Sequence, residues 1–450
     1  MNIVIALLVF TVIVVLHELG HFLLAKKNGV GVVEFSVGMG PRLLTWVKTD
    51  EKMTFKLLAS QDYCEKREDW QGHTWYSIKL FPIGGSCMMV GEDEVNDAPN
   101  SFQRAGVWAK ISIIAAGPIF NFISAFIFAL ILIGSIGYNP SVVTYITPDS
   151  AVEKAGIQVG DRITEINGTK IQIGSDYNTY FALHDVGDEP MTIAYTTADG
   201  QEKEAKIDPH CYRLGYSYAS GEKNGEASVS AVEEGSPMEK AGIKVGDVIT
   251  SINGTAINTM EDMSEYLTKN PLTKEDVTIV YKRADKSTEV KVTPRYSTIQ
   301  SLQIYMGSRV HGNVLDTVKY SGIEIKYLIK TTYQSLGRLL TGKTGMKDMS
   351  GVVGIVDFIG DAVDASPSMM DRLLNLLNIA IFLSANLGVM NLLPIPALDG
   401  GRLVFLFIEL FRGKPADQKL EGLVHLVGIV LLMALMIFVT YNDIIKIVTG

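Results

Sequence analysis

Cysteine is scarce in this sequence, and the few cysteines form no pattern. Cys64, Cys87 and Cys211 lie far apart, and no CxxC pair occurs. A disulfide framework or a cysteine zinc site needs several cysteines at short, regular spacings. The sequence therefore argues against both kinds of site, and we interpret the three thiols as incidental.

Runs of positive charge are also missing. The chain has 40 Lys and Arg against 49 Asp and Glu, a formal net charge of −9 at pH 7, and no stretch that interleaves basic with aromatic residues. Proteins that bind nucleic acids concentrate positive charge on one face or along one helix. We therefore expect no nucleic-acid partner.

Apolar sequence, by contrast, is abundant, at 47% of 450 residues. Residues 3–25 are almost wholly apolar and would, as a helix, span roughly 34 Å, enough to cross a bilayer. They lack the basic start and the small-residue cleavage site of a signal peptide. Further apolar runs at 107–136, 373–398 and 423–440 bring the expected number of membrane spans to four.

Basic residues beside these runs predict the orientation of the chain in the cell membrane. Lys26 and Lys27 follow the first run, and four more basic residues lie between the third run and the fourth: Arg402, Arg412, Lys414 and Lys419. Short connections rich in Lys and Arg stay in the cytoplasm. Both termini and the long segment 137–371 are therefore expected outside the cytoplasm.

The long external segment contains an internal repeat. Residues 150–171 recur at 236–257 with the same Ala-Gly, Gly-Asp and Ile-Asn-Gly elements. Each copy predicts a short helix, a strand and tight turns, as in a small globular domain. The pattern resembles the PDZ domain, so we expect two PDZ domains, which bind extended peptides at a sheet edge. A spacer without any ligand is the alternative.

The first apolar run contains a candidate metal site, the HExxH motif from His17 to His21. Positions i and i+4 share one face of a helix, so both imidazoles can bind one ion beside Glu18. Zinc accepts two His and a carboxylate and keeps one position for a water, whose proton Glu18 would take. Ionisable residues in a spanning helix cost about 2.5–3.5 kcal/mol each, which a metal would offset. A polar seam against another helix is the alternative.

Asp399 is the natural third ligand, because it is the only acid in the third apolar run or at its cytoplasmic edge. Pro394 and Pro396 cannot lie in the interior of a regular helix, so this span is expected to break where it meets the metal. The alternative is a helix that ends near Leu393, followed by an ordinary turn with Asp399 in solvent.

Together these motifs resemble those of bacterial site-2 proteases, intramembrane zinc metalloproteases of the type that processes anti-sigma factors and remnant signal peptides. His17, Glu18 and His21 match the family's HExxH motif, and Asp399 matches its LDG motif. The resemblance implies a Zn2+ site made by His17, His21 and Asp399, on the cytoplasmic side, with Glu18 as the catalytic residue.

The resemblance also implies which residues hold the substrate. Asn391 and Pro394 match the family's NxxP element, and Gly38 and Gly40 match the glycines of a membrane-reentrant β-hairpin that pairs with substrate. A transmembrane helix must be unwound before cleavage, so we expect the edge of residues 35–40 to accept it as an added strand. The implied partners are the lipid bilayer and single-pass transmembrane substrates, trimmed first by a site-1-type protease and screened by the PDZ domains.

Other signals are weaker. Ser86 to Met89 stand where the family commonly has Tyr-Val-Lys-Met, which puts the details of this element in doubt. Asn121 also fits a family element, but we interpret it as an interhelical hydrogen-bonding residue, not a catalytic one. Five histidines without motif partners are interpreted as surface or packed residues: His73, His184, His210, His311 and His425.

The expected fold is a multi-domain membrane protein with an α-helical transmembrane core of four spans, a membrane-reentrant β-hairpin and two external α+β PDZ domains. In chain order its parts are the first transmembrane helix at 1–25, a cytoplasmic-side segment with the hairpin at 26–106, the second helix at 107–138, the PDZ domains at 139–222 and 223–298, a membrane-surface amphipathic segment at 299–371, the third span at 372–401, a cytoplasmic loop at 402–421 and the fourth helix at 422–450. Two other classes stay open: a non-enzymatic membrane scaffold, and a transporter, which would need inverted repeats.

Overall fold

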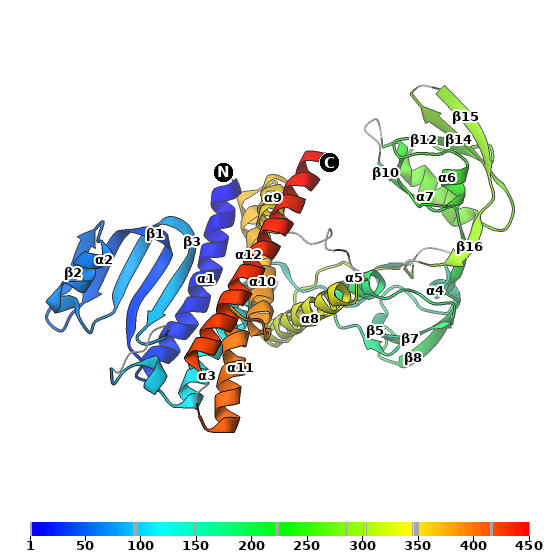
Figure 1. The fold of residues 1–450 in the computed structure, drawn as a ribbon. Helices are drawn as coiled ribbons and strands as arrows, with labels where there is room; N and C mark the ends of the chain where they lie inside the picture. The colour runs from blue at the N-terminus through cyan, green and yellow to red at the C-terminus, as the bar shows by residue number, and fades with distance from the viewer. Residues whose placement is uncertain are drawn as a thin grey trace. The chain divides into compact units, whose positions relative to one another are not determined.

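The computed structural model describes residues 2–92, 98–146, 150–220, 225–284, 286–299, 301, 302, 304–343, 345, 351–414 and 417–449. The chain divides into two compact units (Figure 1). The first consists of Met1–Tyr138 together with His311–Gly450, and the second of Asn139–Val310. The first unit contains the apolar helices, and the second contains the sequence repeat.

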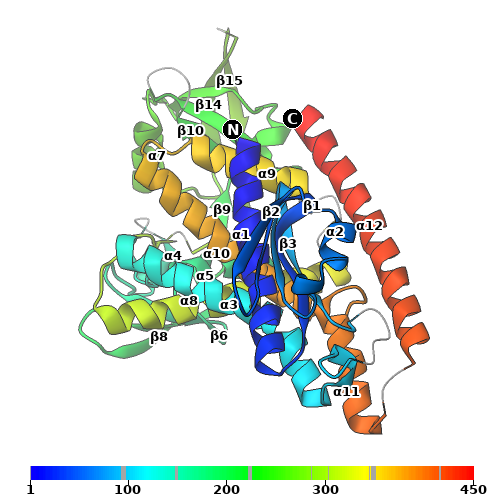
Figure 2. The ribbon, with the colours of Figure 1, turned by 90° about the vertical axis from the view of Figure 1, so that its left-hand side faces the viewer.

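Within the described residues, four helices are long and apolar enough to cross a membrane: α1 (Asn2–Lys27), α3 (Val107–Ile136), α10 (Met369–Leu392) and α12 (Gln418–Thr449). The four predicted spans are confirmed as helices. α3 contacts α1 and α10, so it forms the centre of the helical core. α12 is the least enclosed, because 11% of its apolar stretch is buried against 28–39% in the others. Figure 2 shows α12 at the margin of the unit.

A β-sheet lies beside α1. The strands β1 (Val32–Lys48), β2 (Met53–Leu57) and β3 (Trp75–Met89) form it in the order β2-β1-β3, with antiparallel pairing. Figure 1 shows β3 next to α1. Short helical turns accompany the sheet: α2 (Gln61–Glu65), η1 (Glu68–Trp70) and η2 (Phe102–Arg104).

Both long strands bend in the middle, and the bend decides which segment is an edge. Ser36 pairs with Ser77 and also with Ser86. Residues 34–37, the first arm of β1, therefore lie between residues 75–78 and residues 85–88, the two arms of β3. Residues 85–89 of β3 have β1 on one side and no strand of the described residues on the other. The predicted edge strand at 35–40 is therefore wrong for residues 35–37, which have strand partners on both sides, whereas Met39 pairs with Phe81 alone.

The third apolar run breaks where its prolines predict. α10 ends at Leu392, and α11 (Asp399–Arg412) begins at Asp399. The predicted cytoplasmic loop at 402–421 is wrong over its first half, because helix continues to Arg412. Gly413, in a left-handed conformation, then ends α11. The break between the two helices delivers Asp399 as the first residue of a new helix.

Two further helices, α8 (Val314–Leu340) and α9 (Val352–Asp364), precede α10. α8 buries Ile325 and Leu328 against α3 and α10 and exposes apolar residues such as Val314 at its start. This agrees with the predicted amphipathic helix. Its place at a membrane surface stays a prediction.

The repeat forms two small domains with separate cores, both in the second unit. The first has a sheet in the order β6-β5-β7-β8, and the second has a sheet in the order β10-β11-β12-β14-β15, with β13 paired to β12. The elements are β4 (Tyr145–Ile146), α4 (Ala151–Lys154), β5 (Arg162–Ile166), β6 (Thr169–Lys170), α5 (Gly174–Leu183), β7 (Met191–Thr196), β8 (Glu202–Ile207), β9 (His210–Arg213), β10 (Tyr216–Ser220), β11 (Ala227–Val232), α6 (Pro237–Lys240), β12 (Val248–Ile252), β13 (Thr255–Ala256), α7 (Met260–Lys269), β14 (Val277–Arg283), β15 (Lys286–Val292), β16 (Arg295–Thr298) and β17 (Ile304–Tyr305).

The same hydrogen bond closes the Gly-Asp turn in both copies. The Asp161 carboxylate accepts from the N–H of Gln158 at 2.8 Å, and the Asp247 carboxylate accepts from the N–H of Lys244 at 2.8 Å. The repeated sequence is therefore a repeated structure. Its assignment to the PDZ fold stays a prediction.

The first of these domains also contains residues from beyond the second. β17 pairs with β4, and Ile299 and Leu302 are buried in the first core. The predicted boundary after residue 298 is therefore wrong for Ile299, Leu302 and β17, which belong to the first domain. A two-residue strand has no periodicity from which the sequence could have predicted this return. The predicted boundary between residues 222 and 223 is also wrong, because β10 lies in the second sheet.

The two cores predict separable effects of mutation. Ile163 and Ile249 occupy equivalent positions, are fully buried, and lie one in each core. We expect Ile163→Ala and Ile249→Ala each to lower the free energy of unfolding of its own domain by about 2–5 kcal/mol, because each leaves a cavity. Urea denaturation of a fragment spanning residues 139–310 should then show one transition shifted per substitution. A common shift of the whole fragment would contradict separate cores.

Candidate active site

Two histidines of α1 point their rings at each other within the helical core. His17 and His21 are each 7% exposed, and their Nε2 atoms are 3.2 Å apart. The i, i+4 spacing puts both side chains on one face of the helix, as the motif predicts.

Asp399 reaches these histidines from the start of α11. Its Oδ2 atom lies 3.2 Å from Nε2 of His17 and 3.5 Å from Nε2 of His21. The break after α10 makes this possible, because a continuous helix would carry Asp399 onward along its axis. The alternative with Asp399 in solvent does not describe the structure, since its side chain is 17% exposed.

The three side chains fit a metal ion. Their ligand atoms all lie within 4.8 Å of one another, the one such group among the described residues. Tetrahedral zinc with bonds of about 2.0–2.2 Å holds its ligand atoms roughly 3.3–3.6 Å apart, close to the spacings here. Asp399 Oδ2 is also buried without a hydrogen-bond partner in the part of the chain described. Burial of such an oxygen is costly unless an ion or a donor meets it.

Hydrogen bonds on the far side of each ring orient both histidines. His21 Nδ1 lies 2.9 Å from the Ile113 carbonyl oxygen, which only accepts, so Nδ1 carries a proton and, in the neutral ring, Nε2 keeps its lone pair. His17 Nδ1 lies 3.1 Å from the amide of Asn121. An amide can present either its oxygen or its nitrogen there, and presenting the oxygen would free Nε2 of His17 in the same way.

Asn121 is therefore more than the interhelical residue that we predicted. It is fully buried on α3 and contacts a candidate metal ligand directly. A buried amide in an apolar helix was the available signal. Its partner could not be read from the sequence, because the packing of α1 against α3 decides it.

Glycines make room for the histidine pair. A Cβ atom on Gly117 of α3 would lie 2.3 Å from Nε2 of His21, and one on Gly20 would lie 2.4 Å from the Ala116 carbonyl oxygen. Such distances are far inside van der Waals contact. α1 and α3 can therefore approach closely only because both positions lack a side chain.

Glu18 faces the edge arm of β3. The backbone N–H of Cys87 donates to Glu18 Oε2 at 2.9 Å, and the N–H of Met89 lies 3.4 Å from Glu92 Oε2. Both N–H groups thus point away from β1, toward the open side of the strand. Carboxylates occupy the donors with which another strand would pair.

The four residues predicted to hold the substrate lie in two separate parts of the structure. Asn391, half-buried, lies in the last turn of α10, and Pro394, exposed, lies in the break. Gly38 and Gly40 have φ of +85° and +87° and turn β1 against Phe81. The predicted approach of Asp399 to the two histidines is thus present in the structure, whereas the open edge of the sheet lies at residues 85–89 and not at the predicted segment.

Two ion pairs that sequence reasoning missed hold α11 in place. Lys110 Nζ lies 3.0 Å from Glu409 Oε1, and Arg402 pairs with Glu92. Both pairs line a cavity of about 590 Å³ beside the start of α3. Their partners lie hundreds of residues apart in the sequence, so no local pattern announces them.

Comparison with known proteins identifies a family and several relatives that match nearly the whole chain. The family model "Peptidase family M50" matches residues 5–69 and 64–435. The chain is 32% identical over 448 residues to a Clostridium acetobutylicum protein whose name places it among zinc metalloproteases, covering 99% of this chain and 97% of that one. It is 29% identical over 454 residues to the regulator of sigma-W protease RasP of Bacillus subtilis, covering 98% of each.

A likeness to a solved structure is much more limited. The PDZ domain of HtrA3 aligns with 20% of this chain and 88% of its own length, at 14% identity and a TM-score of 0.17. The family and its relatives cover the helices and the site. With four apolar helices, this chain is a multi-pass membrane protein that belongs to peptidase family M50, the zinc metalloproteases of the site-2 type.

Proposed function

We propose that this zinc metalloprotease hydrolyses peptide bonds within transmembrane segments of other proteins. The observation that carries the proposal is the convergence of His17, His21 and Asp399 at 3.2–3.5 Å inside a core of apolar helices. A hydrolytic site at this depth meets substrates that lie in the bilayer.

In this proposal His17, His21 and Asp399 hold the Zn2+ ion, and Glu18 acts on protons. Zinc, when bound, supplies a Lewis acid that lowers the pKa of a water and polarises a carbonyl oxygen. The Glu18 carboxylate accepts the proton of the attacking water and later delivers it to the leaving amine nitrogen. Asn121 and the Ile113 carbonyl keep both imidazoles turned with Nε2 toward the centre.

The substrate is proposed to bind as an extended strand along residues 85–89. This arm runs beside Glu18, and its outward N–H groups belong to the backbone, so they recognise any sequence. A strand that takes the Cys87 N–H would release Glu18 for its reaction with water. Asn391 and Pro394 would hold the strand from the opposite side, while Gly38 and Gly40 shape the turn that lets the sheet reenter the membrane.

The second unit is proposed to lie outside the cytoplasm, as are both termini, with the site toward the cytoplasmic side. Its two repeated domains would act as PDZ domains that exclude substrates with large external parts. Cleavage would then follow an earlier cut by a site-1-type protease. The sigma-W regulation named in the B. subtilis relative favours a regulatory single-pass membrane protein, such as an anti-sigma factor, as substrate.

Glu18→Gln and Asp399→Ala should separate catalysis from metal binding. We expect Glu18→Gln to lower turnover of a transmembrane model substrate by about 10²–10⁴-fold while its zinc content stays normal, because the amide cannot accept a proton. Asp399→Ala should lose both activity and zinc, since a ligand is removed. Metal analysis of the purified proteins distinguishes the two. Full activity of Glu18→Gln would favour a scaffold over a protease.

Cys87→Pro tests the edge strand, with Cys87→Ala as the matched control. Proline removes the N–H that points at Glu18 and should leave the pairing with β1 intact, because that N–H does not take part in it. We expect kcat/KM to fall roughly 10-fold or more in Cys87→Pro, as a hydrogen bond to substrate is lost. Cys87→Ala should keep normal activity. Equal activities in the two variants, at equal zinc content, would count against strand addition at this arm.

Removal of residues 139–310 tests the screening role. We expect the shortened enzyme to cleave full-length substrate about as fast as substrate already trimmed outside the membrane, since the barrier to large external domains is gone. The intact enzyme should prefer trimmed substrate. Cleavage rates of both substrates in membranes provide the measurement, and an unchanged preference would contradict the proposal.

A further inference from the structure

The loop between α10 and α11 ends in an unusual backbone conformation. Ala397, two residues before Asp399, has φ of +78°, in the left-handed region that residues with a side chain rarely adopt. This φ sets the direction in which the chain enters α11. A different conformation at Ala397 would turn the Asp399 carboxylate away from the two histidines.

α12 supplies the contact that holds this conformation. The N–H of Ala397 donates to Nδ1 of His425 at 2.9 Å. Among the described residues, His425 is the one side chain that hydrogen-bonds the backbone of residues 393–398. Three residues further along α12, a Cβ atom on Gly428 would lie 2.5 Å from Cβ of Pro396 and 2.6 Å from its carbonyl oxygen. The loop therefore rests on the bare backbone of Gly428.

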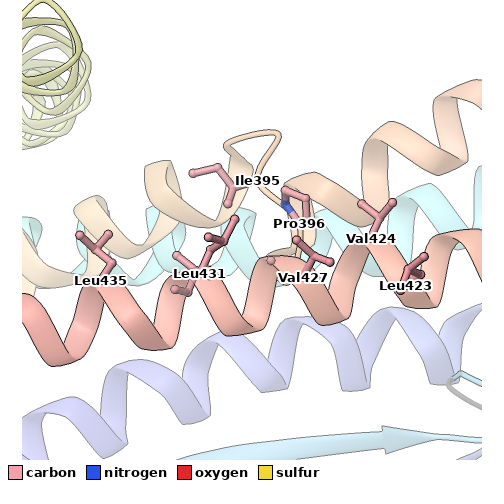
Figure 3. Close-up of a pocket in the computed structure, with 9 residues that line it drawn as sticks. Ile395, Pro396, Leu423, Val424, Val427, Leu431 and Leu435 are labelled. Atoms are coloured by element: carbon pink, nitrogen blue, oxygen red, sulfur yellow. The ribbon is translucent and has the colours of Figure 1, made fainter.

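Elsewhere the loop and α12 fit together loosely. An apolar cavity of about 370 Å³ lies between them, lined by Ile395 and Pro396 on one side and by Val427 and Leu431 on the other (Figure 3). Space along most of the contact means that packing alone does not fix the loop. The loop has backbone hydrogen bonds of its own, from the Ile395 N–H to Leu393 and from the Leu398 N–H to Ile395. The restraint that α12 adds is concentrated where His425 and Gly428 touch Ala397 and Pro396.

We propose that His425 and Gly428 are positioning residues for the metal site. They act through Ala397. His425 accepts a hydrogen bond from the Ala397 N–H, and Gly428 lets Pro396 pack against the backbone of α12. The left-handed turn at Ala397 then directs the Asp399 carboxylate toward His17 and His21. The inference rests on the proposed role of Asp399 as a zinc ligand. It assigns to α12, which contributes no ligand, control over how tightly the ion is held.

The test compares zinc release from full-length variants in detergent, measured as transfer of zinc to an excess of a colorimetric chelator. We expect His425→Leu to release zinc about 10–100-fold faster than the unchanged protein, the range typical of losing a partner that orients a metal ligand. His425→Asn should release it at nearly the normal rate, because the Asn oxygen can accept the Ala397 N–H. Adding Ala397→Gly to His425→Leu should restore retention, since glycine adopts a left-handed φ readily. A purely structural role for His425 predicts no such rescue.

Gly428→Ala provides a second route if His425→Leu folds poorly. It should speed zinc release by lifting Pro396 away from α12. Gly422→Ala is the matched control on the same helix, because nothing lies within 4 Å of a Cβ there. Normal zinc retention by His425→Leu or Gly428→Ala would overturn the inference, as would failure of Ala397→Gly to rescue. Asp399→Ala, measured in parallel, distinguishes failure of this inference from failure of the proposed ligand set. If Asp399→Ala also keeps its zinc, the assignment of Asp399 as a ligand is wrong.

Discussion

The structure depends on bringing two imidazoles and one carboxylate together inside an apolar helical core, where each of them alone would be unfavourable. Polar groups inside an apolar helical core are costly unless they meet one another or an ion. Gly20 and Gly117 let α1 pack closely against α3 and leave room for the two imidazole rings. The break after α10 then brings the Asp399 carboxylate to them. The contacts that pack the helical core therefore also bring the three candidate ligands together.

In the proposed function, Glu18 and the substrate-binding edge at residues 85–89 are linked through one backbone group. Glu18 occupies the Cys87 N–H, which belongs to the open side of β3. An edge strand with free N–H groups can pair with strands of other chains, and a carboxylate that accepts from such an N–H prevents this pairing. If the proposed substrate strand binds at this edge, it must displace the Glu18 carboxylate from the Cys87 N–H, so substrate binding would also free Glu18.

Sequence reasoning found the helices, the repeat and the three candidate ligands because each has a local signature. Apolar length marks the spans, i, i+4 spacing marks His17 and His21, and prolines mark the break before Asp399. The bent pairing of β1 with β3 has no such signature, so the edge was put at residues 35–40 instead of 85–89. Asn121 was predicted as an interhelical hydrogen-bonding residue without a named partner, and His425 as a surface or packed residue. Their importance comes from what they touch across helices, which no spacing in the chain encodes.

One detail of the second unit concerns how such a module is attached. β4, near its beginning, pairs with β17, near its end, so the chain enters and leaves the unit side by side. A domain with adjacent ends can be inserted into a connection between helices without forcing those helices apart. Modules of different size can then be exchanged at this junction over evolution, while the helical unit keeps its geometry.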